Sequence, residues 1–377
     1  MKKLTARLRI GVVGLGRAFA VMVPAFRDPR IGLVAATDPR PEACRKFAKD
    51  FHGRTHATVE DLCADPGVDV VYVATPHELH AAHACLAAAA GKHVLVEKPM
   101  ALTLEDCRAM IGAARKAGVQ LIVGHSHSFD APVLQARKII ESGAYGRLRM
   151  ITALNFTDFV YRPRRPEELA TGAVFNQAAH HVDVVRLLAG GNVRSLRAFT
   201  GNWDAARPTD GAYSALLAFD NDVSASLTYS GYAHFDSDEF MGWIGEMGQR
   251  KKPADHGGAR KRLKGNELAL KNARNYGGKR FKPARSARHQ HFGVVIASCE
   301  RADLRPLPDG VMIYGDRTKK LERLPAPRIS RVEVIDELCA AVLQGKAPLH
   351  GGESAMATLQ VCLAMLDSSR QGKEILL

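Results

Sequence analysis

The chain has 377 residues, of which 46% are hydrophobic, and a formal net charge of +14. This size and composition predict an ordinary globular protein with room for two domains and a large core. No apolar run is long enough to span a membrane, and the short basic start runs into glycines without a cleavage site, so we expect neither a membrane anchor nor a signal peptide.

The cysteine pattern and the charge distribution exclude further classes of protein. Seven cysteines are scattered without C-x-x-C pairs, which predicts reduced thiols in a cytoplasm and argues against a disulfide framework or a zinc site. Residues 249–288 carry fourteen Lys or Arg and two acids, and so hold +12 of the net charge. The basicity is therefore local, and because few aromatic residues accompany it we expect no nucleic-acid binding.

The first 126 residues alternate short apolar strands with helices. The stretches LRIGVVG, GLVAATD, VDVVYVAT, HVLVEKP and QLIVGHS are apolar throughout, which is typical of a parallel sheet covered on both faces. One of the helices between them has a capping box at Thr103 and Asp106 and a stop at Gly118. The alternation predicts an α/β domain over residues 1–127, a Rossmann fold with a doubly wound parallel sheet.

The pattern changes after about residue 127. Long stretches with period-two alternation, such as VRSLRAFTGN and GAYSALLAF, are typical of an antiparallel sheet with one face on helices. Two closing helices are predicted near residues 330–345 and 352–370. We expect an α+β domain with an open, mainly antiparallel sheet over residues 128–377, with a basic, mobile inserted loop at about 245–290.

A glycine turn between the first strand and helix indicates a dinucleotide site. Gly14 and Gly16 supply the first two glycines of a G-x-G-x-x-G turn, which lets a pyrophosphate approach the backbone, although Phe19 stands at the third position. Asp38 ends the second strand, where an acid binds the ribose 2′-OH of NAD. Two alternatives remain, a plain Asp-Pro turn and a 2′-phosphate of NADP on Arg40. NAD is favoured, and the candidate cofactor-binding residues are Gly14, Gly16, Arg17, Ala18, Phe19, Asp38 and Arg40.

The strand VLVEKPM ends in two opposite charges and a proline. In a doubly wound sheet the ligand lies beyond the carboxyl ends of the strands, where Glu97 and Lys98 stand. A residue before proline is restricted to an extended backbone, and the Lys98-Pro99 bond is one of the few that can be cis. Taken alone, Lys98 would more simply be a solvated lysine in a loop.

Two blocks extend this observation. The stretches ATPHELHAAHACLAAAAGKHVLVEKPMALTLED (74–106) and GAVFNQAAHHVDVVRLLAG (172–190) resemble blocks of the glucose-fructose oxidoreductase / inositol dehydrogenase / MocA (Gfo/Idh/MocA) oxidoreductase family. The likeness covers nearly the whole chain. It implies a Rossmann domain followed by an open-sheet domain, NAD(P)-dependent dehydrogenation, often of sugars or polyols, and a homo-oligomer, a dimer or tetramer, built through the open sheet.

The resemblance assigns roles to the first block. Lys98 matches the lysine near the nicotinamide and the reacting hydroxyl, where its cation would stabilise developing alkoxide charge. Glu97 matches a residue that contacts the nicotinamide ribose. The loop that covers the nicotinamide is matched by Thr75, Pro76, His77 and His80. For His80 the alternative is a helix-cap or surface histidine.

The second block supplies a candidate base. His180 precedes Asp183 in the H-x-x-D pattern of the family, and a histidine of near-neutral pKa suits proton abstraction from a hydroxyl. Asn176, four residues earlier on the same helix face, stands where many members have Asp and cannot stabilise an imidazolium as a carboxylate would. His181 is the rival base. Asp183 is a candidate substrate-binding residue.

The stretch GHSHSFD (124–130) departs from the family pattern, which often has an Asn and an Arg where Ser126 and Ser128 stand. The neighbouring His125 and His127 share one face of a strand, an arrangement that can bind metal. No cysteine and no cluster of acidic ligands lies nearby in the sequence. We therefore expect substrate hydrogen bonding by His127 and no metal.

The substrate hypothesis comes from a cluster of arginines. Arg162, Arg164 and Arg165 precede the candidate catalytic helix, and GWIGEMG (242–248) opens the basic segment. Guanidinium groups bind carboxylates bidentately, so these cations predict a small anionic substrate. The stretches resemble the family branch that includes phthalate 4,5-cis-dihydrodiol dehydrogenase, which implies an NAD-linked dehydrogenase of an anionic cyclic diol. The alternatives are a sugar or polyol dehydrogenase and a catalytically silent NAD-binding regulator.

Overall fold

The computed structural model describes residues 7–124, 126–282 and 287–377, which divide into two compact units. The N-terminal unit groups the described residues of 1–125, 269–285 and 329–359, and the C-terminal unit groups those of 126–268, 286–328 and 360–377. The sequence predicted a single boundary at residue 127. The units are instead discontinuous, because part of the basic segment and most of the closing helices pack with the Rossmann strands.

The N-terminal unit is built on a six-stranded parallel sheet in the order β3-β2-β1-β4-β5-β6. The five predicted strands form, since their apolar residues are almost all buried. The sixth, β3, was not predicted because its two residues are both exposed. The strands are β1 (Leu8–Val13), β2 (Ile31–Thr37), β3 (Arg54–Thr55), β4 (Val70–Val73), β5 (His93–Val96) and β6 (Leu121–Val123).

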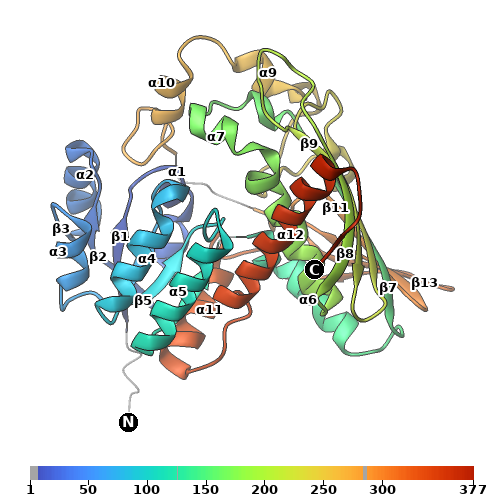
Figure 1. Ribbon diagram of the computed structural model, residues 1–377, viewed down its shortest axis with the longest axis horizontal. Helices are drawn as coiled ribbons and strands as arrows, with labels where there is room; N and C mark the ends of the chain where they lie inside the picture. Colours follow the sequence, from blue (N-terminus) through green and yellow to red (C-terminus); the bar gives the residue numbers. More distant parts are fainter. Residues whose placement is uncertain (1–6, 125, 283–286) are drawn as a thin grey trace. The chain divides into compact units, whose positions relative to one another are not determined.

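Helices cover both faces of this sheet. Helices α1 and α2 lie on one face and α4 and α5 on the other, where α4 and α5 lie side by side (Figure 1). The predicted caps of α5 are confirmed, since Thr103 Oγ1 accepts from the Asp106 amide at 3.1 Å and Gly118 is left-handed at φ 66°. The helices are α1 (Arg17–Met22), α2 (Pro41–Phe51), α3 (Val59–Ala64), α4 (His80–Ala89), α5 (Leu104–Ala117) and α11 (Val332–Gln344), with 3₁₀ turns η1 (Ala25–Arg27) and η2 (His77–Leu79).

The C-terminal unit contains a nine-stranded sheet in the order β14-β13-β12-β11-β7-β10-β9-β8-β15. The β7–β10 pair is parallel and the other pairs are antiparallel, which confirms a mainly antiparallel sheet. The strands are β7 (Leu148–Phe156), β8 (Val193–Gly201), β9 (Ala212–Phe219), β10 (Ser224–Ser230), β11 (Val294–Cys299), β12 (Ala302–Leu307), β13 (Gly310–Gly315), β14 (Lys319–Arg323) and β15 (Ile375–Leu376).

One face of this sheet is covered by helices and the other is open. Alternate residues such as Ile151 and Leu227 are buried under α6, α8 and the end of α12. Their neighbours Met150, Phe199 and Leu216 are about half exposed or more, at 48%, 60% and 64%. The helical elements are η3 (His127–Phe129), α6 (Ala131–Glu141), η4 (Phe159–Tyr161), α7 (Pro166–Ala170), the π-helix η5 (Val174–Ala178), α8 (Ala179–Ala189) and α12 (Gly352–Gln371).

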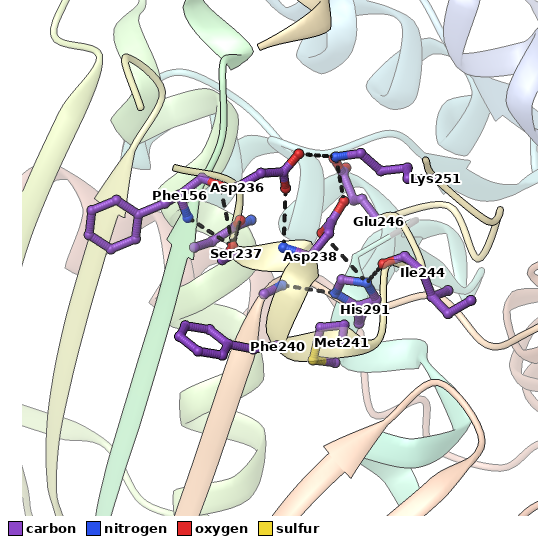
Figure 2. Close-up of polar contacts among 12 residues, drawn as sticks. Phe156, Asp236, Ser237, Asp238, Phe240, Met241, Ile244, Glu246, Lys251 and His291 are labelled. Atoms are coloured by element: carbon purple, nitrogen blue, oxygen red, sulfur yellow. Dashed lines mark hydrogen bonds and ion pairs between the residues drawn. The ribbon is translucent and has the colours of Figure 1, made fainter. Parts of the chain in front are cut away.

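The basic segment has local structure rather than being one long loop. After η6 (Ser237–Met241), Lys251 forms ion pairs with Asp236 and Asp238, as Figure 2 shows. Three short helical pieces follow. They are η7 (Pro253–Asp255), α9 (Gly258–Arg262) and α10 (Glu267–Asn272). Within the residues described, no helix is both long and apolar enough to cross a membrane.

The later part of this segment contributes a buried aromatic residue to the N-terminal unit. Tyr276 is 1% exposed, its ring lies 5.0 Å from Phe19 of α1 and 6.2 Å from Phe51 of α2, and its hydroxyl donates to Asp50 at 2.7 Å. A tyrosine more than 220 residues away in sequence thus completes the aromatic core between the first two helices.

We predict that Tyr276→Ala lowers the free energy of unfolding of the N-terminal unit by about 3 kcal/mol, the usual cost of removing a buried ring. Tyr276→Phe keeps the ring and removes only the bond to Asp50, so it should cost about 1 kcal/mol. Urea denaturation of both variants measures the difference. Equal stability of Tyr276→Ala and wild type would show that the segment does not pack there.

Candidate functional site

The glycine turn after β1 has the shape of a phosphate cradle. Gly14 has φ 95°, and a Cβ there would lie 2.7 Å from the carbonyl oxygen of Ala74, so only glycine fits. A Cβ on Gly16 would meet nothing within 4 Å. The turn therefore leaves open space next to its backbone, which fits the close approach of a dinucleotide pyrophosphate.

Asp38 lies beside this turn with a largely enclosed carboxylate. Its side chain is 5% exposed, and Oδ2 accepts from the Leu15 amide at 2.7 Å. Arg40 donates from Nε to Asp38 Oδ1 at 2.9 Å and from Nη2 to the Leu15 carbonyl at 2.8 Å. The arginine that was the candidate 2′-phosphate receptor is thus held by the acid and by the turn.

Phe19 requires a correction. It occupies the third position of the glycine pattern and was therefore a candidate cofactor-binding residue. The ring is fully buried between Phe26, Phe47 and Tyr276, so the side chain is part of the core. Of the other candidates in the turn, Arg17 is partly exposed, and its Nη1 lies 3.5 Å from the carbonyl oxygen of Arg274.

The ends of β4 and β5 are tied together by His80. Its ring is fully buried, with Nδ1 2.9 Å from the carbonyl oxygen of Pro99 and Nε2 3.0 Å from that of Thr75. Burial lowers the pKa of His80 despite these two acceptors, so the neutral ring donates to one of them at a time. The ring is neither a surface nor a capping histidine. It holds two strand-end loops in place.

The charges of the EKP stretch differ in exposure. Glu97 is buried and accepts a hydrogen bond of 2.5 Å from the Tyr72 hydroxyl, whereas Lys98 is only partly buried. The Lys98-Pro99 bond is cis. Thr75, Pro76 and His77, at the end of the neighbouring strand, are also partly exposed. Lys98 and the loop at Thr75 therefore lie at the ends of two adjacent parallel strands.

In the C-terminal unit, a π-helix leads into the candidate catalytic helix, and such turns are frequent at functional sites. Asn176 lies in this π-helix, and its Nδ2 donates to the Gly172 carbonyl at 2.8 Å and to Thr171 Oγ1 at 3.1 Å. The amide thus fastens the start of the helix. His180 follows on α8 and is 6% exposed.

The rival His181 is a core residue. It is 1% exposed, and its Nδ1 lies within hydrogen-bond distance of the Tyr213 hydroxyl, at 2.8 Å. Its ring packs edge-on against Phe292 at 4.8 Å. Burial lowers the pKa of His181 to about 3, so the ring is neutral in the folded protein. These contacts leave His181 unsuited to take a proton from a substrate.

His127 lies between two carboxylates. Its Nδ1 is 2.7 Å from Asp130 Oδ2, its Nε2 is 3.6 Å from Glu246 Oε1, and its ring is 4.8 Å from that of His180. Burial opposes the charge, but Asp130 and Glu246 outweigh it and raise the pKa of His127. The side chain is 2% exposed, so this candidate substrate ligand is enclosed by protein groups.

The arginines before the candidate catalytic helix differ in their partners. Arg162 Nη1 lies 3.3 Å from Glu246 Oε2, and its Cζ lies 5.2 Å from the ring centroid of Phe159. The Cζ of Arg164 lies 3.6 Å from the same centroid. Burial lowers the pKa of Arg164 to about 10, which leaves it charged at neutral pH. Glu246 and Asp130 were not predicted as site residues.

The remaining candidates have structural contacts. Asp183 on α8 accepts a hydrogen bond from Ser128 Oγ, which ties the helix to η3. His125, the other member of the possible metal pair, lies outside the described residues. Among those that are described, no three His, Cys, Asp or Glu side chains are grouped to hold a metal ion.

Two family models match the chain. A model of an oxidoreductase family with an NAD-binding Rossmann fold matches residues 8–125, which include the glycine turn and the EKP stretch. A model of the GFO/IDH/MocA C-terminal domain matches residues 133–249, which include His180 and the arginines.

Relatives match over the full length. A 1-carboxy-3-chloro-3,4-dihydroxycyclohexa-1,5-diene dehydrogenase from Comamonas testosteroni is 50% identical over 377 residues, covering 96% of this chain and 95% of the relative. A crystal structure described as a dehydrogenase from Bordetella bronchiseptica RB50 has a TM-score of 0.93 at 39% identity, covering 98% of this chain and 100% of the other. An aldose-aldose oxidoreductase from Caulobacter crescentus, with a TM-score of 0.72 at 23% identity and coverage of 98% and 100%, shares the fold.

The state of His181 predicts an acid-dependent loss of stability. Below pH 6.5 the unfolded chain protonates this histidine, whereas the folded state does so only near its lowered pKa of about 3, so acid favours unfolding. At pH 5 this contributes about 2 kcal/mol. His181→Gln should therefore lose about 2 kcal/mol less than wild type between pH 7.5 and pH 5 in urea denaturation. His52→Gln, which removes an exposed histidine, is the control. Parallel pH profiles of His181→Gln and wild type would contradict the assignment.

Proposed function

The chain belongs to the GFO/IDH/MocA oxidoreductase family and is an NAD(P)-dependent dehydrogenase, and from this premise we propose that it oxidises one carbinol of a carboxylated cyclic cis-dihydrodiol. The observation that carries the proposal is the pair of adjacent arginines, Arg162 and Arg164, in the same unit as His180. The relative from Comamonas testosteroni, by its name, acts on a diol with one carboxyl group and two hydroxyls. A carboxylate on the substrate would give these cations their partner.

We propose that NAD is preferred over NADP. The glycine turn would hold the pyrophosphate, and Asp38 would accept hydrogen bonds from the ribose diol while repelling a 2′-phosphate. Arg40 is engaged by Asp38 and by the Leu15 carbonyl, which supports this preference. Glu97 and the loop at Thr75 would bind the nicotinamide ribose and cover the ring. The cofactor supplies a hydride acceptor.

The proposed oxidation removes a hydride from the carbinol carbon and a proton from its hydroxyl. We propose that His180 takes the hydroxyl proton and that Lys98 stabilises the developing alkoxide, while bound NAD would supply the acceptor for the hydride. Asn176 fixes the start of the helix that carries His180. The product is a hydroxy-enone, which tautomerises to a catechol. Aromatisation makes the oxidation of a dihydrodiol favourable.

A second candidate comes from the family. Sugar and polyol dehydrogenases share this fold, and a neutral substrate would leave the arginines without a ligand role. A silent NAD-binding regulator is the candidate of another class, and the retention of both Lys98 and His180 argues against it.

Two further properties belong to the proposal. The open face of the large sheet presents Met150, Phe199 and Leu216, so we propose that it mediates self-association into a dimer or tetramer. The scattered cysteines support work in a reducing cytoplasm. Analytical ultracentrifugation of wild type and Leu216→Glu tests the first point, since a charge on this face should favour smaller species.

The proposed function is tested by steady-state kinetics with NAD and four substrates. These are the cis-dihydrodiols of phthalate, benzoate and benzene, with two, one and no carboxylates, and myo-inositol. We expect at least one carboxylated diol to have the highest kcat/KM. A preference for inositol would favour the polyol alternative. Cofactor binding without turnover of any compound would favour the regulator.

We predict that Lys98→Ala leaves the fold intact and lowers kcat about 10²-fold or more, since it removes a preorganised cation. Lys98→Arg keeps the charge and should recover part of the loss. Circular dichroism checks the fold, and stopped-flow measurement of NADH formation measures the chemical step. A near-normal kcat in Lys98→Ala would remove this residue from the mechanism.

We predict that His180→Ala lowers kcat about 10²–10⁴-fold, the usual range for loss of a general base. The acid limb of the kcat/KM pH profile should disappear with it. The matched variant is His181→Gln, which leaves the base in place and should retain most of the activity. If only His181→Gln were inactive, the roles of the two histidines would be reversed.

A further inference from the structure

A short hairpin at residues 243–251, at the start of the basic segment, places Glu246 beside Arg162. The Lys251 amide donates to the Trp243 carbonyl and the Gly245 amide to the Gln249 carbonyl, each at 2.7 Å. His291 holds the hairpin, with Nε2 2.8 Å from the Ile244 carbonyl oxygen and its amide donating to the Glu246 carbonyl at 3.2 Å. Figure 2 shows Lys251 anchoring the other side on Asp236 and Asp238.

The Glu246 carboxylate is shared between Arg162 and His127. Oε2 lies 3.3 Å from Arg162 Nη1, and Oε1 lies 3.6 Å from His127 Nε2. Burial disfavours its charge, but Arg162 and His127 outweigh this and hold the pKa of the Glu246 carboxyl well below its usual range. Glu246 is therefore an anion at any pH at which the enzyme works.

Arg164 stands apart from the two ion pairs around Glu246. Asp130 pairs with His127, and Glu246 pairs with Arg162. No carboxylate of the described residues lies within ion-pair distance of the Arg164 guanidinium, although Glu168 favours its charged form from farther away. The Arg164 cation lies instead on the face of Phe159, 3.6 Å from the ring centroid. A guanidinium that lies on a ring and has no carboxylate at ion-pair distance is stabilised when an anionic ligand binds beside it.

We infer that Glu246 sets the charge of the substrate: it neutralises Arg162 and leaves Arg164, on the ring of Phe159, to receive a carboxylate, so the enzyme prefers a diol with one carboxylate to a diol with two. This inference rests on the proposed function, which it sharpens from carboxylated diols in general to monocarboxylates. Glu246 acts here as a specificity determinant. It repels a second carboxylate from the Arg162 side, since like charges placed together in a partly buried site are unfavourable.

The wild-type enzyme gives the first test. With NAD, we expect kcat/KM for the benzoate cis-dihydrodiol to exceed that for the phthalate cis-dihydrodiol by about tenfold or more, the effect of one charged hydrogen bond. A preference for the phthalate compound would overturn the inference and leave the proposed function standing. Absence of turnover with every diol would overturn both.

Substitution of Glu246 gives the second test. Glu246→Gln frees Arg162, so the ratio of kcat/KM for the dicarboxylate to that for the monocarboxylate should rise about tenfold or more. The double variant Arg162→Met/Glu246→Gln removes the freed cation and should return the ratio to near the wild-type value. Glu239→Gln makes the same change at an exposed position in η6, just before the hairpin, and should leave the ratio unchanged. An unchanged ratio in Glu246→Gln would overturn the inference.

A third variant decides the matter if Glu246→Gln fails to fold. Arg164→Met should lower kcat/KM for the monocarboxylate about tenfold or more relative to the uncharged benzene cis-dihydrodiol. Circular dichroism and gel filtration establish that the variant is folded. If Arg164→Met kept the wild-type preference for the carboxylate, Arg164 would not be the receptor.

Discussion

A carboxylate that is largely shielded from water is stabilised by the cations and donors around it, and much of the C-terminal site follows from this constraint on Glu246, whose side chain is 24% exposed. Glu246 pairs with Arg162 and lies beside His127, and His127 pairs in turn with Asp130. The four groups come from three places in the sequence. These contacts therefore hold three parts of the C-terminal unit together. The parts are the stretch at 158–169, the turn η3 and the hairpin at 243–251. The ring of His180 lies against this arrangement at His127.

The fold was largely predictable because its strands follow simple rules. The parallel strands are apolar throughout and the long antiparallel strands alternate, so their type and approximate limits could be read from the sequence. The misses have a common physical reason. The two-residue strand β3 and the closing strand β15 have too few residues to show a period, and β12 contains charged residues and a proline. The π-helix before α8 has no known sequence pattern that distinguishes it from an α-helix.

The two units were less predictable than their elements. A boundary near residue 127 separates two sequence patterns, but packing does not follow the chain order. Helix α11 packs with the N-terminal unit, and Arg30 reaches Asp336 on it at 2.6 Å. Tyr276 enters the same unit from the basic segment. Hydrophobic periodicity shows that a helix has an apolar face, and it does not show which surface will cover that face.

Site residues divide in the same way. Motifs could identify Gly14, Lys98 and His180 as candidates because each belongs to a local pattern. They could not show that the Phe19 side chain points into the core and away from the cofactor-binding turn, because a motif specifies positions in the sequence and not the directions of side chains. Glu246 was missed for a different reason. It lies 119 residues from His127, and one acid in a basic segment carries no local signal of its partners.

The basic segment also shows why net charge is a poor guide to partners. Lys251 is paired with Asp236 and Asp238, and Arg260 donates to the Tyr232 carbonyl at 2.7 Å while its Cζ lies 3.8 Å from the ring of Tyr161. These cations anchor the segment to the C-terminal unit, so part of its charge is used within the chain. What the segment contributes is an anion, Glu246, and a buried ring, Tyr276. Its charge helps to hold these two residues in place, and through Glu246 the segment determines which charges remain for a substrate.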